Sequence, residues 1–260
     1  MKSEQGEERR NPAKRPGRWI GGIAAAAALV VVLFLVPTTL GAVSPAASTI
    51  FTAPYKGLPE DATFIDTEGC GATIALSVGP SFVAKTGVGT YSGTTSSKAC
   101  PDQFGEDSSD IIAEVGYNGS LWKQTASGKA TATALFNLSW KASVKASTAS
   151  PKQSADASVS ILIELAVVSA STQEVVASGL TLALTMEVTN GTMTSHKVDY
   201  TLKCATDAGK LVSGKQYYLT AEIEIVQESD VTSTGSSSAS TSLNMGTGGN
   251  EAQMVSITVS

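Results

Sequence analysis

Residues suited to acid–base or nucleophilic catalysis are few in this chain. The only histidine is His196, in the stretch Thr-Ser-His-Lys. A hydrolase of the Ser-His-Asp type needs a histidine beside an activated serine, and the sequence contains no nucleophile-elbow motif. One histidine and three scattered cysteines also predict no zinc site of ordinary ligand spacing. We therefore interpret His196 as an exposed histidine at the start of a strand, and we predict no enzyme activity, catalytic residue, metal or cofactor.

Carboxylates provide two further candidates for chemistry. Glu222 and Glu224 are two residues apart, and paired acids serve glycosidases, but acids that alternate along a strand also keep its outer face soluble. A second group follows Cys100: Asp102, Glu106, Asp107 and Asp110. Clustered oxygens can bind Ca²⁺, but this spacing matches no calcium-binding loop. We interpret the pair as outward-facing strand residues and the group as a solvated acidic loop.

The cysteines predict one disulfide and one thiol, because the residues that carry them are expected outside the cytoplasm. Cys70 and Cys100 lie in turn-like contexts that are close in sequence, and we expect them to pair. Closing that loop stabilises the fold by roughly 3–4 kcal/mol in the chain-entropy model. Cys204 continues an apolar row and is expected to remain a buried thiol. The alternative pairing of Cys204 with Cys70 or Cys100 stays open.

Three Asn-x-Ser/Thr sequons are candidate glycosylation sites: Asn118, Asn137 and Asn190. In a chain this rich in Ser and Thr, sequons also arise by chance. Asn137 falls on the polar face of a predicted strand, where a glycan can be accommodated. Asn118 and Asn190 precede glycine and equally mark tight turns.

The elements that must position these residues are strands, because apolar residues recur with period two from residue 61 onward. Every even position from 130 to 144 is apolar, and the odd positions are polar except Leu135. That alternation predicts a half-buried strand, long enough to need a bulge or bend, and excludes a helix. It also predicts that Trp140 is buried and that Trp122, in a polar context, is partly exposed. Similar rows cover 111–117, 159–167, 180–188, 198–204 and 217–225, so residues 61–260 are predicted to form an all-β antiparallel sandwich.

The stretch Leu211-Val-Ser-Gly214-Lys-Gln-Tyr217 leads directly into one of these rows. It resembles the tyrosine corner of immunoglobulin-like and fibronectin type III-like sandwiches, although the usual proline before the glycine is Ser213 here. The resemblance implies an immunoglobulin-like antiparallel β-sandwich in which the Tyr217 phenol bonds back to nearby backbone. It also implies that 217–227 is the penultimate strand, 253–260 the last, and 232–250 a flexible loop between them.

Residues 20–36 contain no charge, and the uncharged run continues to Tyr55. As a helix, residues 20–43 would extend about 36 Å, enough to cross a hydrocarbon core of roughly 30 Å. The preceding segment 1–19 carries six Lys or Arg against three Glu, which places the N-terminus in the cytoplasm. We favour an uncleaved transmembrane signal anchor, with a cleaved signal peptide or a pilin-like filament segment as alternatives. Residues 44–60 contain three prolines and are predicted to be a linker.

Beyond residue 43 the chain has twelve Lys, no Arg and twenty Asp or Glu, a net charge of −8. Such a surface does not bind a phosphate backbone, so no nucleic-acid partner is predicted. Location and fold class favour a membrane-anchored or secreted cell-surface protein with a role in adhesion, envelope structure or ligand binding. Its expected contacts are the membrane, through residues 20–43, and a protein or carbohydrate partner. The alternatives are an exported hydrolase or carbohydrate-active domain, and a surface-filament subunit.

Overall fold

The structure is a computed structural model that describes residues 49–55, 58–100, 105–124, 128–149, 153–233, 236–246 and 251–260. The chain divides into two compact units, Met1–Val36 and Pro37–Ser260, and every described residue lies in the second. Within these ranges, no helix is long and apolar enough to cross a membrane. The predicted segments 1–19 and 20–43 lie outside the described residues.

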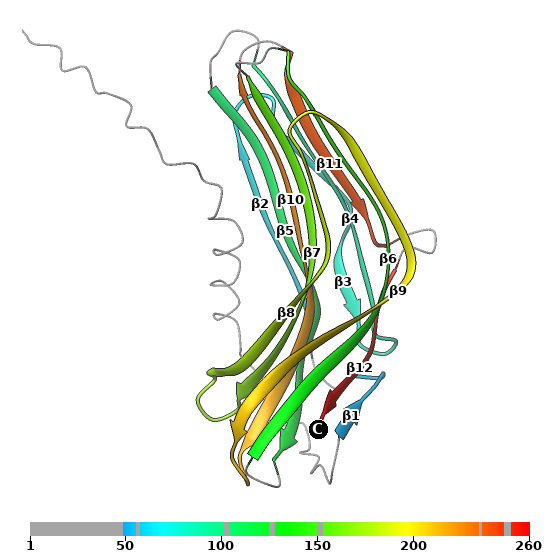
Figure 1. Cartoon of the computed structure of the whole chain (residues 1–260), viewed down its shortest axis with the longest axis vertical. Helices are drawn as coiled ribbons and strands as arrows, with labels where there is room; N and C mark the ends of the chain where they lie inside the picture. The colour runs from blue at the N-terminus through cyan, green and yellow to red at the C-terminus, as the bar shows by residue number, and fades with distance from the viewer. Residues whose placement is uncertain are drawn as a thin grey trace, which may run out of the picture. The chain divides into compact units, whose positions relative to one another are not determined.

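The described strands pair antiparallel in two sheets (Figure 1). The five-stranded sheet has the order β2-β5-β10-β7-β8. Its strands are β2 (Leu58–Glu68), β5 (Gly105–Lys123), β7 (Ser154–Ser169), β8 (Val175–Val188) and β10 (Gln216–Ser233). The central strand, β10, pairs with β7 in continuous register and with β5 in a register that shifts once, between Leu219 and Thr220.

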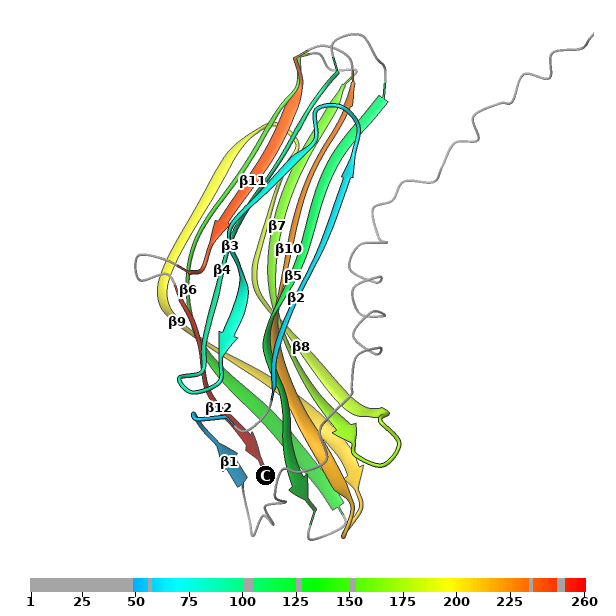
Figure 2. The same ribbon diagram turned by 180° about the vertical axis from the view of Figure 1, so that it is seen from behind.

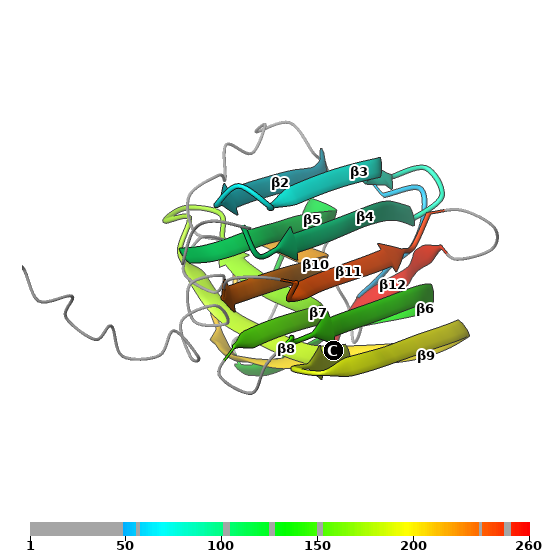
Figure 3. The same cartoon turned by 90° about the horizontal axis from the view of Figure 1, so that it is seen from above.

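The seven-stranded sheet has the order β1-β12-β4-β11-β6-β9, with further pairings of β3 with β4 and of β12 with β6. Its strands are β1 (Thr49–Phe51), β3 (Thr73–Val83), β4 (Val88–Lys98), β6 (Gly128–Ser147), β9 (Gly191–Leu211), β11 (Ser238–Asn244) and β12 (Ala252–Val259). Figure 2 shows β1 beside β12, and Figure 3 shows the two sheets as layers. The predicted all-β architecture with two antiparallel sheets is therefore confirmed.

The core lies between the sheets and consists of the alternating rows predicted from the sequence. On β6 every even-numbered residue from 130 to 146 is buried, and Trp140 is only 1% exposed. The predicted rows of β5, β7 and β10 are buried as well: residues 111–117, 159–167 and 217–225 at their odd positions. The expected irregularity of β6 is present, because its register with β9 shifts between Leu138 and Trp140. Strand alternation thus accounts for most of the core.

One part of the core is polar and connects the two sheets. The buried side chain of Gln227 on β10 donates from Nε2 to Oγ1 of Thr241 at 2.8 Å and to the carbonyl oxygen of Gly93 at 3.3 Å. The hydroxyl of Tyr91 on β4 donates to Oε1 of the same glutamine. Buried polar groups need such partners, so Gln227 fixes how β10 faces β4 and β11.

Bulges explain two predicted rows that are only partly correct. In β8 the register with β7 shifts at Ala183, so Met186 is buried whereas Leu180 and Leu182 are 54% and 53% exposed. In β9 Val198 is 58% exposed, although Cys204 in the same predicted row is fully buried. An extra residue reverses the side-chain alternation, and period-two counting does not detect it.

Several local predictions are wrong. The predicted linker 44–60 contributes β1 and the beginning of β2, and the predicted loop 232–250 contains β11, which is the penultimate strand in place of β10. Trp122 is fully buried, not partly exposed, because it stacks on Tyr217 with ring centroids 5.4 Å apart.

Candidate functional site

The outer face of the five-stranded sheet carries charged side chains of one sign. Even-numbered residues of β10 point away from the core, and the register identifies their outward-pointing neighbours on β2, β5, β7 and β8. The acids on this face are Asp66, Glu68, Glu106, Asp110, Glu114, Asp156, Glu164, Glu187, Glu222, Glu224, Glu228 and Asp230. The five strands contain a single lysine, Lys123, and no arginine. We call this surface the acidic face.

Four glutamates at the middle of the acidic face form cross-strand neighbours, which we call the acid row. Glu224 lies directly opposite Glu114 of β5, and Glu222 lies directly opposite Glu164 of β7. Like charges placed opposite each other on a sheet repel and are destabilising. The sequence correctly predicts that Glu222 and Glu224 point outward, but not that they are only 4% and 6% exposed.

Burial and mutual repulsion change how the acid row titrates. Burial, followed by the negative charges of Glu114 and Glu164, raises the pKa of Glu224. Burial, followed by the charge of Glu114, raises the pKa of Glu164, and burial raises the pKa of Glu114. Each carboxyl therefore holds its proton to a higher pH than an isolated glutamate does. The arrangement can store protons and attract cations.

Exposed apolar side chains accompany these acids. Leu180 pairs with Glu164 across β7 and β8, Leu182 pairs with Leu162, and Phe64 on β2 is 42% exposed. Large apolar side chains exposed on a sheet face are typical of surfaces that contact another molecule. The acidic face therefore combines one charge sign with apolar contact points.

The outer face of the seven-stranded sheet has a different character. Its exposed charged residues include Lys98, Lys141, Lys145 and Lys203. These lysines lie among Ser and Thr residues such as those of β4 and β11. The two outer faces therefore differ in the sign of their charge, which gives the domain two chemically distinct sides.

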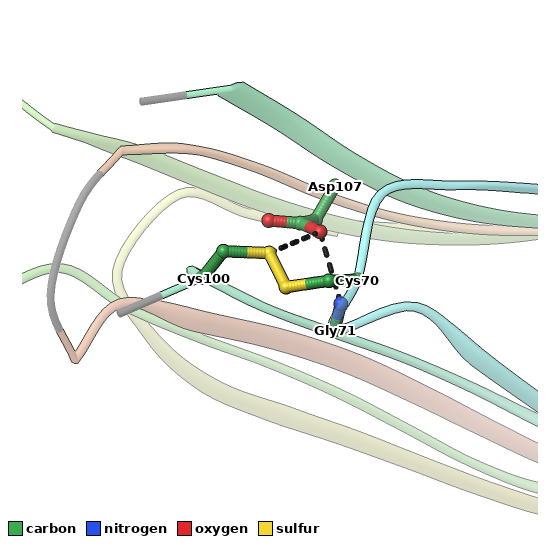
Figure 4. Close-up of a disulfide and its surroundings, with 4 residues drawn as sticks. All are labelled: Cys70, Gly71, Cys100 and Asp107. Atoms are coloured by element: carbon green, nitrogen blue, oxygen red, sulfur yellow. Dashed lines mark hydrogen bonds between the residues drawn. A yellow bond between two sulfur atoms is a disulfide. The ribbon is translucent and has the colours of Figure 1, made fainter. Parts of the chain in front are cut away.

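The disulfide predicted between Cys70 and Cys100 is present, with a Cα–Cα distance of 6.1 Å, and Cys204 is a buried free cysteine as predicted. The rival pairings of Cys204 are therefore wrong. Figure 4 shows Asp107 beside this disulfide. Asp107 belongs to β5 and is 2% exposed, so the stretch predicted to be a solvated loop is a strand from residue 105 onward, whereas Asp102 lies outside the described residues.

The three sequons occupy different settings. Asn190 is exposed in the turn between β8 and β9, where Gly191 has φ of +110°. Asn137 is half-buried, and its Nδ2 donates to Oδ1 of Asp199 at 3.4 Å. Asn118 lies inside β5 and not in a turn, and its side chain lies outside the described residues. Of these three, Asn190 is placed where a glycan meets open solvent.

The tyrosine-corner residues lie together at one end of β10. The phenol oxygen of Tyr217 accepts a hydrogen bond from the backbone N–H of Val212 at 3.0 Å, which is the type of contact that the resemblance implies. Leu211 is buried, and Gly214 has φ of +81°, a conformation that favours glycine. A surface hollow nearby is lined by Lys123, Ala170, Ser171, Gly214, Lys215 and Gln216. That hollow contains none of the acids of the acid row.

His196 is exposed on β9, as predicted, and lies opposite Lys141. Sequence reasoning missed Asp107 and Glu164 as members of side-chain clusters, because their neighbours come from other strands. No protein-family model and no curated protein matches this chain. Its function must therefore be inferred from its own residues.

Proposed function

We propose that this protein is a non-enzymatic cell-surface β-sandwich that binds a partner, for adhesion, envelope structure or ligand recognition. The observation that carries the proposal is the acidic face, with its single charge sign and its exposed Leu180 and Leu182. A surface of one sign attracts an oppositely charged partner from a distance, and exposed apolar groups then contribute contact area. The partner that fits this chemistry is a cationic protein or carbohydrate surface.

For the fold, we propose an immunoglobulin-like or fibronectin type III-like sandwich. The hydrogen bond from the Val212 N–H to the Tyr217 phenol supports this assignment, as does the position of Gly214 in the intervening turn. The strand β11, which lies between the strand after the corner and the last strand, departs from the order that the resemblance implies.

For location, the proposal places the domain outside the cytoplasm, with residues 20–43 as its signal anchor or cleaved signal peptide. The basic segment 1–19 and the long uncharged run support this orientation. The disulfide between Cys70 and Cys100 is consistent with an oxidising compartment. Asn190 is the sequon we expect to carry a glycan in a host that glycosylates exported proteins.

The test is binding of the full chain, in a non-ionic detergent, to beads coated with polylysine or with polyglutamate. Wild-type protein should bind polylysine and not polyglutamate, with binding that weakens as salt is raised, because screening shortens the reach of surface charges. Replacing two exposed acids of the acidic face, Asp66→Lys and Glu187→Lys, should weaken binding to polylysine.

A matched variant keeps the net charge change constant and moves it elsewhere. Glu174→Lys combined with Glu251→Lys alters two exposed acids that lie outside the strands of the acidic face. This variant should bind polylysine nearly as well as wild type. Equal loss in both variants would attribute binding to net charge alone, and unchanged binding in both would refute the role of the acidic face.

A further inference from the structure

A buried carboxylate lies against the disulfide (Figure 4). Oδ1 of Asp107 is 3.3 Å from Sγ of Cys100, and Asp107 is only 2% exposed. The two cysteine sulfur atoms and a carboxylate oxygen of Asp107 all lie within 4.8 Å of one another. Two sulfurs and one carboxylate oxygen are thus collected from β5 and from the segments that follow β2 and β4.

The turn around Cys70 is shaped to hold this carboxylate. The backbone N–H of Gly71 donates to Oδ1 of Asp107 at 3.0 Å. Gly69 has φ of +94°, and a Cβ added there would lie 2.0 Å from the same oxygen. Any other residue at position 69 would therefore displace the carboxylate or the turn. The position of Asp107 beside the sulfurs is fixed by backbone and not by chance surface proximity.

The contact changes its nature with the oxidation state of the cysteines. A disulfide sulfur has no proton, so in the oxidised protein Cys100 cannot donate to Asp107. A dithiol reductant would take the place of the protein disulfide: the reductant forms its own S–S bond, and Cys70 and Cys100 each receive one of its two protons. The reduced Cys100 thiol then has an acceptor within reach, and both thiols stand next to a carboxylate.

We infer that Cys70, Cys100 and Asp107 form a redox-controlled site for Zn²⁺, closed in the disulfide state and open in the reduced state. Zn²⁺ prefers thiolate, imidazole and carboxylate ligands in a tetrahedral arrangement. Binding would release the two thiol protons to solvent and form two Zn–S bonds and one Zn–O bond, with water as the fourth ligand. Cys70 is exposed, which gives metal and reductant access, whereas Cys100 and Asp107 are buried. This inference is independent of the proposed role of the acidic face.

The test uses the full chain in detergent micelles, oxidised or reduced with a water-soluble phosphine that becomes the phosphine oxide and does not compete for metal. Zn²⁺ uptake is followed by competition with a chromophoric chelator, and Co²⁺ is used as a spectroscopic probe. The reduced chain should bind about one Zn²⁺, with a thiolate-to-Co²⁺ absorption band, and the oxidised chain should bind none. Zn²⁺ should also raise the melting temperature of the reduced chain only.

Three variants separate this site from other ligands. Asp107→Asn should weaken the Zn²⁺ affinity of the reduced chain at least about tenfold, the loss that even an indirect change near a metal produces. Asp66→Asn, an exposed acid on β2, and Cys204→Ser, the remaining cysteine, should leave the affinity unchanged.

Four results would overturn the inference: no uptake by the reduced chain, equal uptake by the oxidised chain, wild-type affinity in Asp107→Asn, or lost affinity in Cys204→Ser. Loss of the strand signal in circular dichroism on reduction would also refute it, because the three ligands would then no longer be held together.

Discussion

Trp122 of β5 and Tyr217 of β10 lie directly opposite each other in the five-stranded sheet, with ring centroids 5.4 Å apart and an angle of 35° between their planes. The pair packs a fully buried indole against the tyrosine whose phenol bonds to the Val212 N–H. One aromatic contact therefore supports both the end of β5 and the turn that precedes β10.

Trp122→Ala should lower the free energy of unfolding by about 3–5 kcal/mol, because truncating a buried tryptophan removes its transfer free energy and leaves a cavity. Urea unfolding measures this, with Trp140→Ala expected to cost a similar amount. Acrylamide should quench neither of these two buried tryptophans strongly in the native protein. Ready quenching of Trp122 in a variant that lacks Trp19 and Trp140 would contradict its burial.

The acid row predicts that stability falls as pH rises. The raised pKa values mean that the folded state holds protons which the unfolded chain has already released, in the window from about pH 4.3, the ordinary glutamate value, up to the raised folded values. The folded state binds more protons there, so the free energy of unfolding decreases with increasing pH across that window. The melting temperature should therefore be higher near pH 5 than near pH 8 as far as these groups determine it.

Glu224→Gln isolates this effect. The neutral amide cannot be repelled by Glu114 or Glu164, so the variant should melt at a higher temperature than wild type near pH 8 and show a flatter pH dependence. Glu68→Gln, an exposed acid on β2, serves as the control and should change the profile little. A Glu224→Gln profile parallel to that of wild type would mean that the acid row does not repel.

Gln227→Leu should destabilise the fold by roughly 1–3 kcal/mol, because it leaves the buried Tyr91 hydroxyl without its acceptor. Adding Tyr91→Phe to this variant should restore part of the loss, since the double variant no longer buries an unpaired hydroxyl. Urea unfolding of wild type, both single variants and the double variant gives the coupling free energy. Strictly additive effects would show that the two side chains do not interact.

A chain that begins at residue 44 should fold without residues 1–43. All the strand pairs that the structure describes lie between residues 49 and 260, including those of β1 with β12. Circular dichroism should show strand and almost no helix, together with a cooperative melting transition. A strongly helical spectrum, or the absence of a transition, would contradict an independent β domain.

The sequence predicts strands well where one residue in two must be buried, as along β6 from Ala130 to Val144. It fails where a distant strand decides the outcome. The context of Trp122 is polar, and nothing near it in sequence indicates that Tyr217 will cover its ring. Ala183 is an ordinary member of an alternating row until pairing with β7 makes it a bulge.

The candidate site shows the same division. Outward orientation of Glu222 and Glu224 follows from alternation, but their burial and their opposition to Glu164 and Glu114 depend on register with two other strands. The disulfide could be predicted because three cysteines allow few pairings. The position of Asp107 against it could not, since the glycine turn that holds the carboxylate has no sequence signature of its own.

In the described part of the chain, β1 pairs with β12 and with no other strand, and its partners are residues 257–259. β4 likewise lies between β11 and β12, with only β3 available to it from the preceding chain. During N-terminus-first translocation, the earliest strands therefore wait for residues that are synthesised last. The seven-stranded sheet can close only once synthesis is finished, so a prematurely terminated product is left open and recognisable to proteases.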